Sequence, residues 1–469
     1  MIPIHNISGK TVAVMGLGRS GLRTAQALQQ AGGVVHAWDD NAAGRKAAEV
    51  ANVTLVPLAE ESWADTVALI LSPGIPHTHP APHPVAAAAR SQGVEIIGDI
   101  ELLKRSMPNA RYIGITGTNG KSTTTTLIGH ILATAGAPVQ IGGNLGQPAL
   151  DLDPLGSGGT YVLELSSFQL ELTPSGGFDI AVLLNITPDH LERHGGMAGY
   201  IAAKQLIFEG CNGTMVVSVD DPECAAICAS LRDISTATVI PISGTTPISG
   251  GVYVENGSLI NDIKGNRETV LPISSVATLP GDHNAQNAAA AYAAAWAAGI
   301  AQYDIITSLQ SYPGLAHRQQ LVARIDGIIY VNDSKATNPE AASRALSCYD
   351  EIYWIAGGRA KGGGLGCLTP FLPRIRHAFL IGEAAAPFAA SLGKAIYTRI
   401  SGTLNAATCE AHALAQQETP DGAVVLLSPA CASYDQYQNF EERGRDFERC
   451  VRALPGDTRQ FYELEKAML

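Results

Sequence analysis

Clusters of basic residues are missing from this sequence of 469 residues. Its 31 lysines and arginines are outnumbered by 43 aspartates and glutamates, which gives a formal charge of −12, and no run of lysine or arginine stands out. Affinity for a nucleic-acid backbone depends on clustered cations, so we expect no nucleic-acid partner. A nucleotide held by backbone amides remains compatible with an acidic chain.

Cysteines are sparse, and no apolar run is long enough to suggest a membrane span. None of the eight cysteines forms a C-x-x-C pair. Cys224 and Cys228 are spaced by one helical turn without a matching His/Cys pair nearby, so we expect buried reduced thiols rather than a zinc site. The alanine-rich residues 285–301 follow a polar stretch and predict a buried helix. The N-terminus lacks the charged-then-apolar pattern of a signal peptide, so we expect a cytoplasmic protein without membrane insertion.

Strands, polar turns and helices alternate along the whole chain. Hydrophobic residues make up 46% and charged residues 16% of it, as in a globular protein. The length exceeds that of one ordinary core and suggests roughly three domains. The alternation favours an α/β fold with parallel, doubly wound sheets. We expect a Rossmann-like domain over residues 1–104, a central P-loop domain over 105–314 and a second Rossmann-like domain over 315–469.

The first domain opens with a strand, a glycine turn, a helix and a second strand. Gly16, Gly18 and Gly21 spell G-x-G-x-x-G, and Asp39 closes the next strand about 20 residues on. A further strand ends in Ser72-Pro73-Gly74, and by the switch-point rule both turns line one ligand crevice. The pattern does not separate NAD from another diphosphate ligand. Glycines that serve only helix–strand packing are the alternative.

The second domain opens on a glycine-rich turn, TGTNGKST, at residues 116–123. It departs from the Walker pattern G-x-x-x-x-G-K-[ST], because Ile115 stands where that pattern has its first glycine. The turn still offers glycines that let amides point inward, a cation for the β- and γ-phosphates and hydroxyls for magnesium, which are Gly117, Gly120, Lys121, Ser122 and Thr123. A strand before it and a helix after it favour nucleotide binding. The alternative is a glycine-rich turn that happens to contain lysine.

Buried strands with polar carboxyl ends are predicted next, over residues 161–171 and 178–194, and polar side chains interrupt or follow their apolar parts. Glu164 lies inside an apolar run, where an unpaired carboxylate is costly to bury, so a magnesium ligand or water-holder is favoured over a strand-edge glutamate in solvent. Asp189 and His190 follow another strand, and the imidazole suits a metal or a substrate carboxylate, with a packed turn residue as the alternative. Lys204 lies in an alanine-rich helix, where spacing alone indicates an ordinary surface lysine.

Further polar residues stand at helix starts and strand ends. Asn284 and Asn287 are three apart and so share one face of a long helix. In the third domain, residues that suit anionic ligands stand at strand ends or turns, and these are Arg318, Asp333, Lys335, Lys361 and Ser433. Together they predict an anion site facing a nucleotide site, which fits phosphoryl transfer to a carboxylate.

Several short stretches, in one order along the chain, carry a resemblance to a known family. They read GITGTNGKST, GGNLGQP, ELSSFQLE, LNITPDHLERH, AAK, GDHNAQNAAAA, HRQQ, NDSKATNPEA and LLSPACASYDQYQNFEERG. The sequence thereby resembles the Mur ligases over essentially its whole length. SSFQL and the last stretch are typical of the glutamate-adding members of that family, and the short TG-x-x-GK[ST] loop is the form it shares with folylpolyglutamate synthases.

This resemblance implies an ATP-dependent, amide-forming ligase. In the family, ATP phosphorylates the alanyl carboxylate of UDP-N-acetylmuramoyl-L-alanine (UDP-MurNAc-L-Ala), and the amine of D-glutamate attacks the acyl phosphate. Phosphorylation makes chemical sense, because a carboxylate is a poor electrophile and needs a leaving group. The implied protein is a monomer with two Mg²⁺ ions. It would act in cytoplasmic peptidoglycan precursor synthesis, and so in cell-wall biogenesis, cell shape and cell division.

The resemblance also implies roles for single residues. Ser122 and Glu164 would hold the first Mg²⁺, and His190 and Lys204 the second, with Lys204 converted by CO₂ into a carbamate. The implied catalytic residues are Lys121, Glu164, His190, Lys204 and Lys335. The implied ATP-binding residues are Gly117, Thr118, Asn119, Gly120, Lys121, Ser122, Thr123, Asn284, Asn287, Arg318 and Asp333. The implied UDP-substrate residues are Gly16, Leu17, Gly18, Arg19, Ser20, Asp39, Asp40, Ser72, Pro73, Gly74, Asn144, Ser166 and Gln169. D-Glutamate would be held by Thr337, Lys361, Ser433 and Phe440.

Three alternatives stay open. Tyr434 stands where leucine is common in the family, and no acidic residue follows Lys361, so a relative that uses L-glutamate or another amino acid is one of them. A NAD-dependent oxidoreductase would explain the G-x-G-x-x-G turn and Asp39, but not the P-loop. A non-catalytic nucleotide switch would tolerate loss of Glu164 and Lys204.

Overall fold

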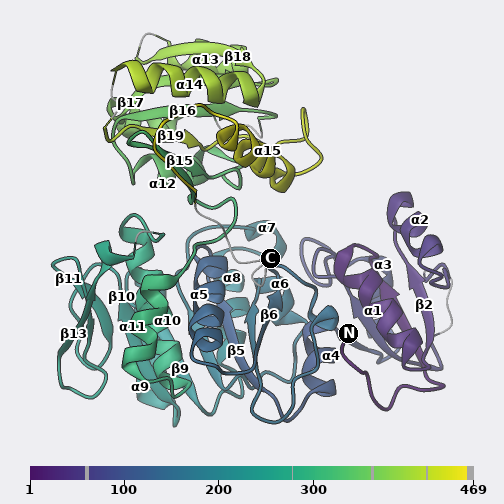
Figure 1. Cartoon of the computed structure of the whole chain (residues 1–469). Coiled ribbons are helices and arrows are strands. Elements are labelled where there is room, and N and C mark those ends of the chain that lie inside the picture. The colour runs from purple at the N-terminus through teal and green to yellow at the C-terminus, as the bar shows by residue number, and fades with distance from the viewer. Residues whose placement is uncertain (59–62, 277, 361–363, 394, 419–420, 462–469) are drawn as a thin grey trace. The chain divides into compact units, whose positions relative to one another are not determined.

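The computed structural model describes residues 1–58, 63–276, 278–360, 364–393, 395–418 and 421–461. The chain forms two compact units, whose elements are labelled in Figure 1. The first unit comprises Met1–Ser275 with Asp282–Gln310, and the second comprises Val276–Gly281 with Ser311–Leu469. Three sheets of mostly parallel strands with intervening helices confirm the α/β class.

The first unit begins with a four-stranded parallel sheet in the order β2-β1-β3-β4. Strands and helices alternate as the Rossmann-like prediction requires. They are β1 (Thr11–Met15), α1 (Arg19–Gln30), β2 (Val34–Trp38), α2 (Ala42–Val50), β3 (Thr66–Leu71), α3 (Pro84–Ser91), β4 (Glu95–Ile97) and α4 (Asp99–Ser106).

The same unit continues into a nine-stranded sheet in the order β13-β12-β11-β10-β9-β8-β5-β7-β6. Its elements are β5 (Arg111–Thr116), α5 (Lys121–Thr134), β6 (Val139–Gly143), η1 (Ala149–Asp151), β7 (Thr160–Glu164), α6 (Ser167–Glu171), β8 (Ile180–Leu183), α7 (Leu191–His194), α8 (Met197–Gln205), η2 (Leu206–Phe208), β9 (Thr214–Ser218), α9 (Pro222–Ile234), β10 (Thr238–Ser243), β11 (Val252–Glu255), β12 (Ser258–Asn261), β13 (Glu268–Pro272), η3 (Ile273–Ser275), α10 (Asp282–Ala297) and α11 (Gln302–Ser311). Figure 1 shows α5 and α10 side by side against this sheet.

The predicted parallel arrangement does not extend to one edge of this sheet. β12 runs antiparallel to both β11 and β13. The reason is the dipeptide Asn256-Gly257, whose φ angles of 48° and 72° form a tight hairpin between β11 and β12. An Asn-Gly pair tolerates two left-handed residues in succession and so closes two antiparallel strands.

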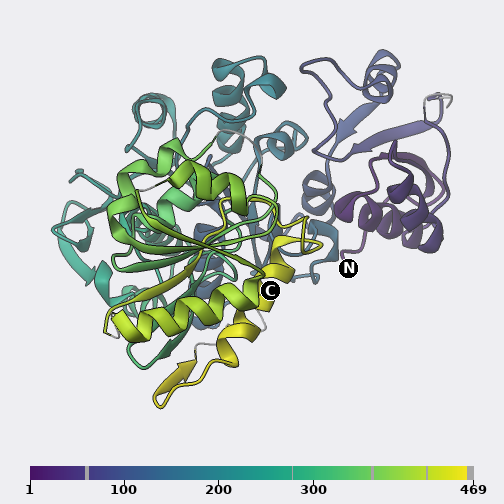
Figure 2. The ribbon, with the colours of Figure 1, turned by 90° about the horizontal axis from the view of Figure 1, so that it is seen from above.

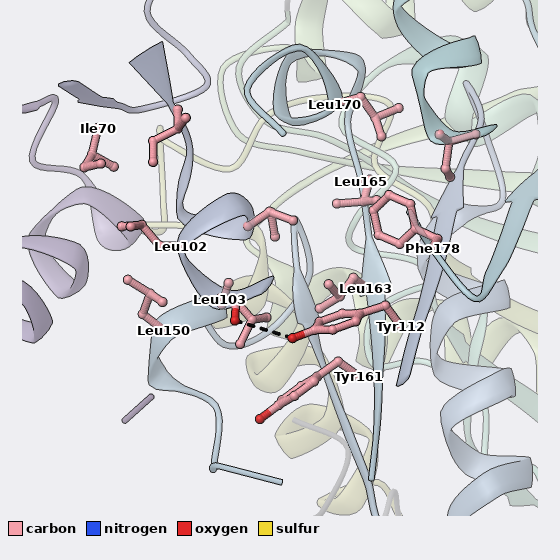
Figure 3. Close-up of a cluster of buried hydrophobic side chains, with 14 of the residues drawn as sticks. Ile70, Leu102, Leu103, Tyr112, Leu150, Tyr161, Leu163, Leu165, Leu170 and Phe178 are labelled. Atoms are coloured by element: carbon pink, nitrogen blue, oxygen red, sulfur yellow. Dashed lines mark hydrogen bonds between the residues drawn. The ribbon is translucent and has the colours of Figure 1, made fainter. Parts of the chain in front are cut away.

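A hydrophobic core joins α4 to the central sheet (Figure 3). Leu103 of α4 lies near the stacked rings of Tyr112 and Tyr161, whose centroids are 5.5 Å apart, and Leu102 belongs to the same cluster. The Tyr112 hydroxyl donates to the carbonyl oxygen of Met107 at 2.9 Å, so the ring is buried with its polar atom satisfied. Ile70 of β3 belongs to the same cluster, which therefore fixes the first sheet beside the second.

The second unit holds a seven-stranded sheet in the order β18-β17-β16-β19-β15-β14-β20. Its elements are β14 (Gln320–Ile325), β15 (Ile328–Asn332), α12 (Pro339–Leu346), β16 (Ile352–Gly357), η4 (Gly366–Arg374), β17 (Ile375–Ile381), α13 (Ala385–Leu392), β18 (Tyr397–Gly402), α14 (Leu404–Glu418), β19 (Val424–Leu427), α15 (Phe440–Arg452) and β20 (Arg459–Phe461). Helices cover both faces of the sheet (Figure 2), with α12 and α13 in one core cluster and α14 and α15 in the other. β14 is antiparallel to β15 and β20, so this sheet too has an antiparallel edge beside its parallel strands.

Several features that the sequence analysis discussed can be located in the structure. The alanine-rich stretch forms α10, and most of its alanines are fully buried. No helix within the described ranges is both long and apolar enough to cross a membrane. Cys224 and Cys228 are free, buried thiols on α9. Among the described residues, no three His, Cys, Asp or Glu side chains are grouped so as to hold a metal ion.

Candidate active site

The turn between β5 and α5 has the backbone of a phosphate cradle. Gly120, the N-cap of α5, has a φ of 81°, and Gly117 has a φ of 151°, values that favour glycine. A Cβ atom on Gly120 would lie 2.3 Å from Oδ1 of Asn287 on α10, so this glycine also permits a close approach. The first amides of a helix have no intrahelical acceptor and attract anions. The strand–turn–helix context predicted for the loop is confirmed.

The side chain of Lys121 folds back over this loop. Its Nζ donates to the carbonyl oxygens of Gly117 at 2.8 Å and Thr118 at 2.9 Å. Asn287 lies beside the start of α5, where its Oδ1 accepts from Thr124 Oγ1 at 3.2 Å and its Nδ2 donates to Asn284 Oδ1 at 2.9 Å. The structure thus brings the predicted cation, the glycines and both asparagines together at one helix N-terminus.

Replacing Gly120 with alanine is expected to weaken ATP binding by at least about tenfold. The added Cβ meets Asn287 Oδ1 on a left-handed backbone, and such a residue costs roughly 1–2 kcal/mol before any clash. The Kd of ATP measured by calorimetry checks this. Gly136→Ala is the matched control, because Gly136 has a φ of 78° at the other end of α5 but no atom within 4 Å of an added Cβ. Equal ATP affinities in the two variants would contradict the prediction.

Glu164 is buried at the end of β7 and faces the loop. Its Oε2 accepts from Ser122 Oγ at 2.6 Å, and its Oε1 accepts from Asn144 Nδ2 at 2.9 Å. With 3% of its surface exposed, Glu164 is not a strand-edge glutamate in solvent, so that alternative is wrong. A buried carboxylate bonded to a hydroxyl at a phosphate cradle supplies the hard oxygen atoms that Mg²⁺ prefers. The residues present therefore fit a magnesium ion.

Lys204 is buried on α8, so the surface-lysine alternative is wrong. Its Nζ donates to the carbonyl oxygen of Gly117 at 2.8 Å and lies 4.7 Å from the centre of the Tyr200 ring. Burial, with a smaller contribution from the nearby Lys121, lowers the pKa of Lys204 to about 7. The charge of Asp189 opposes this shift. A buried amine of this kind is neutral for much of the time near pH 7.

His190 stands at a tight turn before α7. Its φ is 50°, about half of its side chain is exposed, and its Nε2 lies 3.5 Å from Oδ2 of Asp189. The ring packs against that of Phe168, with centroids 5.3 Å apart. No hydrogen bond links His190 to Lys204 among the contacts of the described residues, so their joint metal role stays a prediction.

The two predicted turns of the first sheet do meet. Ser72 Oγ donates to the carbonyl oxygen of Gly16 at 2.9 Å, so both turns lie at the same edge of the sheet, and their lining of one ligand crevice stays a prediction. The Asp39 carboxylate accepts from the amide of Leu17 at 2.5 Å and from the amide of Asn41 at 2.7 Å. Asp39 therefore shapes the glycine turn through its own hydrogen bonds.

Two predicted substrate residues form a helix start instead of a strand end. Ser166 and Gln169 bond reciprocally as a capping box, which begins α6 at Ser167. The predicted strand over residues 161–171 is therefore wrong beyond Glu164. α6 has only five residues, too few for a periodic apolar pattern to announce it.

Sequence reasoning missed a set of contacts between the first sheet and α6–α7. Arg193 Nη1 donates to the carbonyl oxygen of Gly74 at 2.8 Å, and its guanidinium lies 4.4 Å from the centre of the Phe168 ring. The two carboxylate oxygens of Glu171 lie 3.2 Å from His77 Nε2 and 3.2 Å from His194 Nδ1. These contacts hold the Ser72–Gly74 turn beside α7. A local signal was absent, because the partners lie more than 90 residues apart in the pairs Glu171–His77 and Arg193–Gly74.

The second unit gathers several predicted residues at the carboxyl end of β15. Asp333 is buried, and its carboxylate accepts from Ser428 Oγ at 2.7 Å. Burial raises the pKa of Asp333 to about 7, against the opposing effects of Ser428 and, more weakly, Arg318. Lys335 Nζ lies 4.0 Å from the centre of the Phe440 ring. Ser433 is buried, whereas Lys361 lies outside the described residues.

Arg443 is a further residue that the sequence did not single out. It is 1% exposed on α15, and it donates to Ser334 Oγ at 2.9 Å, to the carbonyl oxygen of Ser334 at 2.8 Å and to that of Cys431 at 3.1 Å. Burial lowers the pKa of Arg443 to about 10. The guanidinium therefore ties the turn after β15, which carries Asp333 and Lys335, to the turn after β19, which carries Ser433.

Comparison with known families and structures agrees with this arrangement. Residues 115–295 match the Mur ligase middle domain, and residues 10–98 match the N-terminal domain described as Mur ligase MurD-like. A UDP-N-acetylmuramoylalanine--D-glutamate ligase of Rhodospirillum rubrum is 51% identical over 463 residues, which cover 97% of each chain. One of Caulobacter vibrioides is 49% identical over 97% of this chain and 98% of its own.

Solved structures share the fold at lower identity. The UDP-N-acetylmuramate-alanine ligase MurC of Thermotoga maritima aligns with a TM-score of 0.56 and 16% identity, covering 95% of this chain and 99% of its own. MurF of Acinetobacter baumannii aligns with a TM-score of 0.58 and 19% identity, covering 95% of this chain and 92% of its own. The cradle, the buried carboxylate beside it and the near-complete alignments lead to one conclusion, which is that this chain belongs to the Mur ligase family.

Proposed function

We propose that this protein is an ATP-dependent ligase that adds D-glutamate to UDP-MurNAc-L-Ala during peptidoglycan precursor synthesis. The observation that carries the proposal is the buried Ser122–Glu164–Asn144 arrangement at the mouth of the cradle, in a chain about half identical to ligases with that name. The near-complete coverage of those relatives, on both sides of each alignment, extends the likeness to all three sheets.

The chemistry follows from the need to activate a carboxylate. ATP would donate its γ-phosphoryl group to the alanyl carboxylate, and the amine of D-glutamate would then displace phosphate as the amide bond forms. Lys121 and the amides at the start of α5 offer positive charge to the phosphates. Lys335 would stabilise the charge on the transferred group.

Two metal positions are proposed. Ser122 and Glu164 fit the first Mg²⁺, because their oxygens already face each other at 2.6 Å. His190 and Lys204 are proposed for the second. An ammonium group is no metal ligand, so this role requires Lys204 to be a carbamate, formed when its neutral amine adds CO₂ and loses a proton. When bound, the ions supply charge neutralisation at the phosphates.

The remaining substrates are assigned by the positions of the turns. The turns at Gly16–Ser20 and Ser72–Gly74, with Asp39 and Asp40, would bind the UDP moiety rather than NAD, and Asn144, Ser166 and Gln169 would contact the muramoyl-alanine part. Asn284, Asn287, Arg318 and Asp333 would bind the nucleotide. Thr337, Lys361, Ser433 and Phe440 would hold D-glutamate. We further propose that the protein is a cytoplasmic monomer with functional domains at 1–104, 105–314 and 315–469.

A coupled phosphate-release assay tests the function. Phosphate release from ATP is expected only when UDP-MurNAc-L-Ala and D-glutamate are both present, and the UDP-linked product should gain the mass of one glutamate residue. L-Glutamate in place of D-glutamate should give no product. ATPase activity indifferent to both substrates would support a nucleotide switch instead, and turnover with L-glutamate would support a related ligase.

A further inference from the structure

Asn185, which follows β8, forms hydrogen bonds to the P-loop, the glycine-rich turn at residues 116–123. The carbonyl oxygen of Asn185 accepts from the amide of Thr118 at 2.8 Å, and its Oδ1 accepts from the amide of Asn119 at 2.8 Å. Its Nδ2 donates back to the carbonyl oxygen of Asn119 at 3.2 Å. One side chain thereby binds both polar groups of a loop residue and fixes the orientation of the peptides around it.

The orientation of Asn185 is itself set by Gln286 on α10. Asn185 Nδ2 donates to Gln286 Oε1 at 2.8 Å, across 101 residues of sequence. Gln286 Nε2 donates in turn to Asp220 Oδ2 at 2.8 Å and to Ser218 Oγ at 2.9 Å. An amide side chain can present either its oxygen or its nitrogen, so its neighbours decide which end faces which partner.

Asp220 determines which end of the Gln286 amide faces it, because an ionised carboxylate only accepts hydrogen bonds. It also accepts from Ser243 Oγ at 2.5 Å, from the amide of Gly244 at 2.9 Å and from Thr245 Oγ1 at 3.1 Å. Gln286 must therefore turn Nε2 toward Asp220 and Oε1 toward Asn185. Asn185 must then turn Oδ1 toward the Asn119 amide.

We propose that Gln286 and Asp220 are positioning residues for ATP, which set the polarity of the Asn185 side chain and through it the orientation of the P-loop peptides. The inference rests on the proposed function for its ligand, since the loop is taken to bind ATP. Asp221 provides a separate attachment, accepting from the amide of Ile186 at 3.2 Å, so the end of β8 stays in place when the relay is altered.

The test breaks the hydrogen bond from Gln286 to Asp220 and then restores a bond between the same two positions with donor and acceptor exchanged. In Gln286→Glu, the side chain keeps its shape but loses the N–H group that donates to Asp220. Two carboxylates then face each other. The Kd of ATP, measured by calorimetry on the full chain, is expected to rise about tenfold, the effect of one or two lost hydrogen bonds. Gln286→Leu, which adds no charge, should shift the Kd in the same direction.

The double variant Gln286→Glu with Asp220→Asn exchanges acid and amide. It should recover most of the affinity, because the amide introduced at position 220 can donate to the carboxylate introduced at position 286.

Two further readouts separate positioning from general damage. The KM for UDP-MurNAc-L-Ala should stay within about twofold of the unmodified protein, because the relay leads only to the P-loop. Gln302→Leu removes a hydrogen bond to Tyr292 elsewhere on α10 and should leave the Kd of ATP unchanged. An unaltered Kd in Gln286→Glu, or a double variant no better than the single one, would overturn the proposal. Because ATP binding is measured without the other substrates, failure of the ligase assay would leave this result interpretable.

Discussion

Replacing Glu164 with glutamine is expected to lower kcat by about 10³-fold with little change in stability. Glutamine has the shape of glutamate, and its amide can still accept from Asn144 while it donates to Ser122 Oγ, so both buried contacts survive. What is lost is the negative charge at the mouth of the cradle. If that charge holds Mg²⁺ beside the phosphates, the variant should need much more Mg²⁺ for half-maximal phosphate release.

A second buried carboxylate provides the control for Glu164. Glu101 on α4 is fully buried, accepts from Arg105 Nε at 2.6 Å and from the amide of Ser175 at 3.1 Å, and lies outside the proposed site. Glu101→Gln should lower the melting temperature, because it weakens the pairing of a buried carboxylate with Arg105, and should leave the Mg²⁺ dependence unchanged. Undiminished kcat in Glu164→Gln at ordinary Mg²⁺ concentration would show that Glu164 is structural.

The sequence predicted those parts of the site where a residue type is unusual for the strand or turn that carries it. A lysine and glycines between a strand and a helix, or a carboxylate inside an apolar strand, are hard to explain without a ligand or partner, and Lys121, Gly120 and Glu164 all lie at the cradle. The antiparallel edge had a local signal too, Asn256-Gly257, which the dominant strand–helix alternation obscured.

The features that were missed depend on contacts between distant segments. Gln286 meets Asn185 across 101 residues, and Arg193 meets Gly74 across 119 residues, so no spacing rule reveals either pair. The burial of Lys204 also depends on a contact with a segment distant in the sequence. Its helix is rich in alanine and has no clear polar face, so only the packed structure shows that the amine points inward beneath Gly117.

Replacing Lys204 with alanine is expected to abolish turnover, and added short carboxylic acids are expected to restore part of it. The buried amine has a lowered pKa of about 7, and the neutral form is the one that adds CO₂. The resulting carbamate would keep an N–H that can donate to the carbonyl oxygen of Gly117, now 2.8 Å from Nζ, while adding two oxygens that can ligate a metal. Alanine leaves a space in which formate or acetate can place a carboxylate where the carbamate would be.

Lys104 is a matched control for this experiment, because it is another lysine with a pKa lowered by burial. Its Nζ donates to the carbonyl oxygen of Gly177 at 2.9 Å and lies 4.3 Å from the centre of the Phe178 ring, at the start of the central sheet rather than at the P-loop. Lys104→Ala should reduce stability without making phosphate release depend on added acids. In the unmodified protein, ¹³C-labelled bicarbonate should give a carbamate NMR signal that disappears in Lys204→Ala and persists in Lys104→Ala. If acids give no rescue and no such signal is seen, Lys204 acts as an amine that supports Gly117, and the second metal position must be built from other residues.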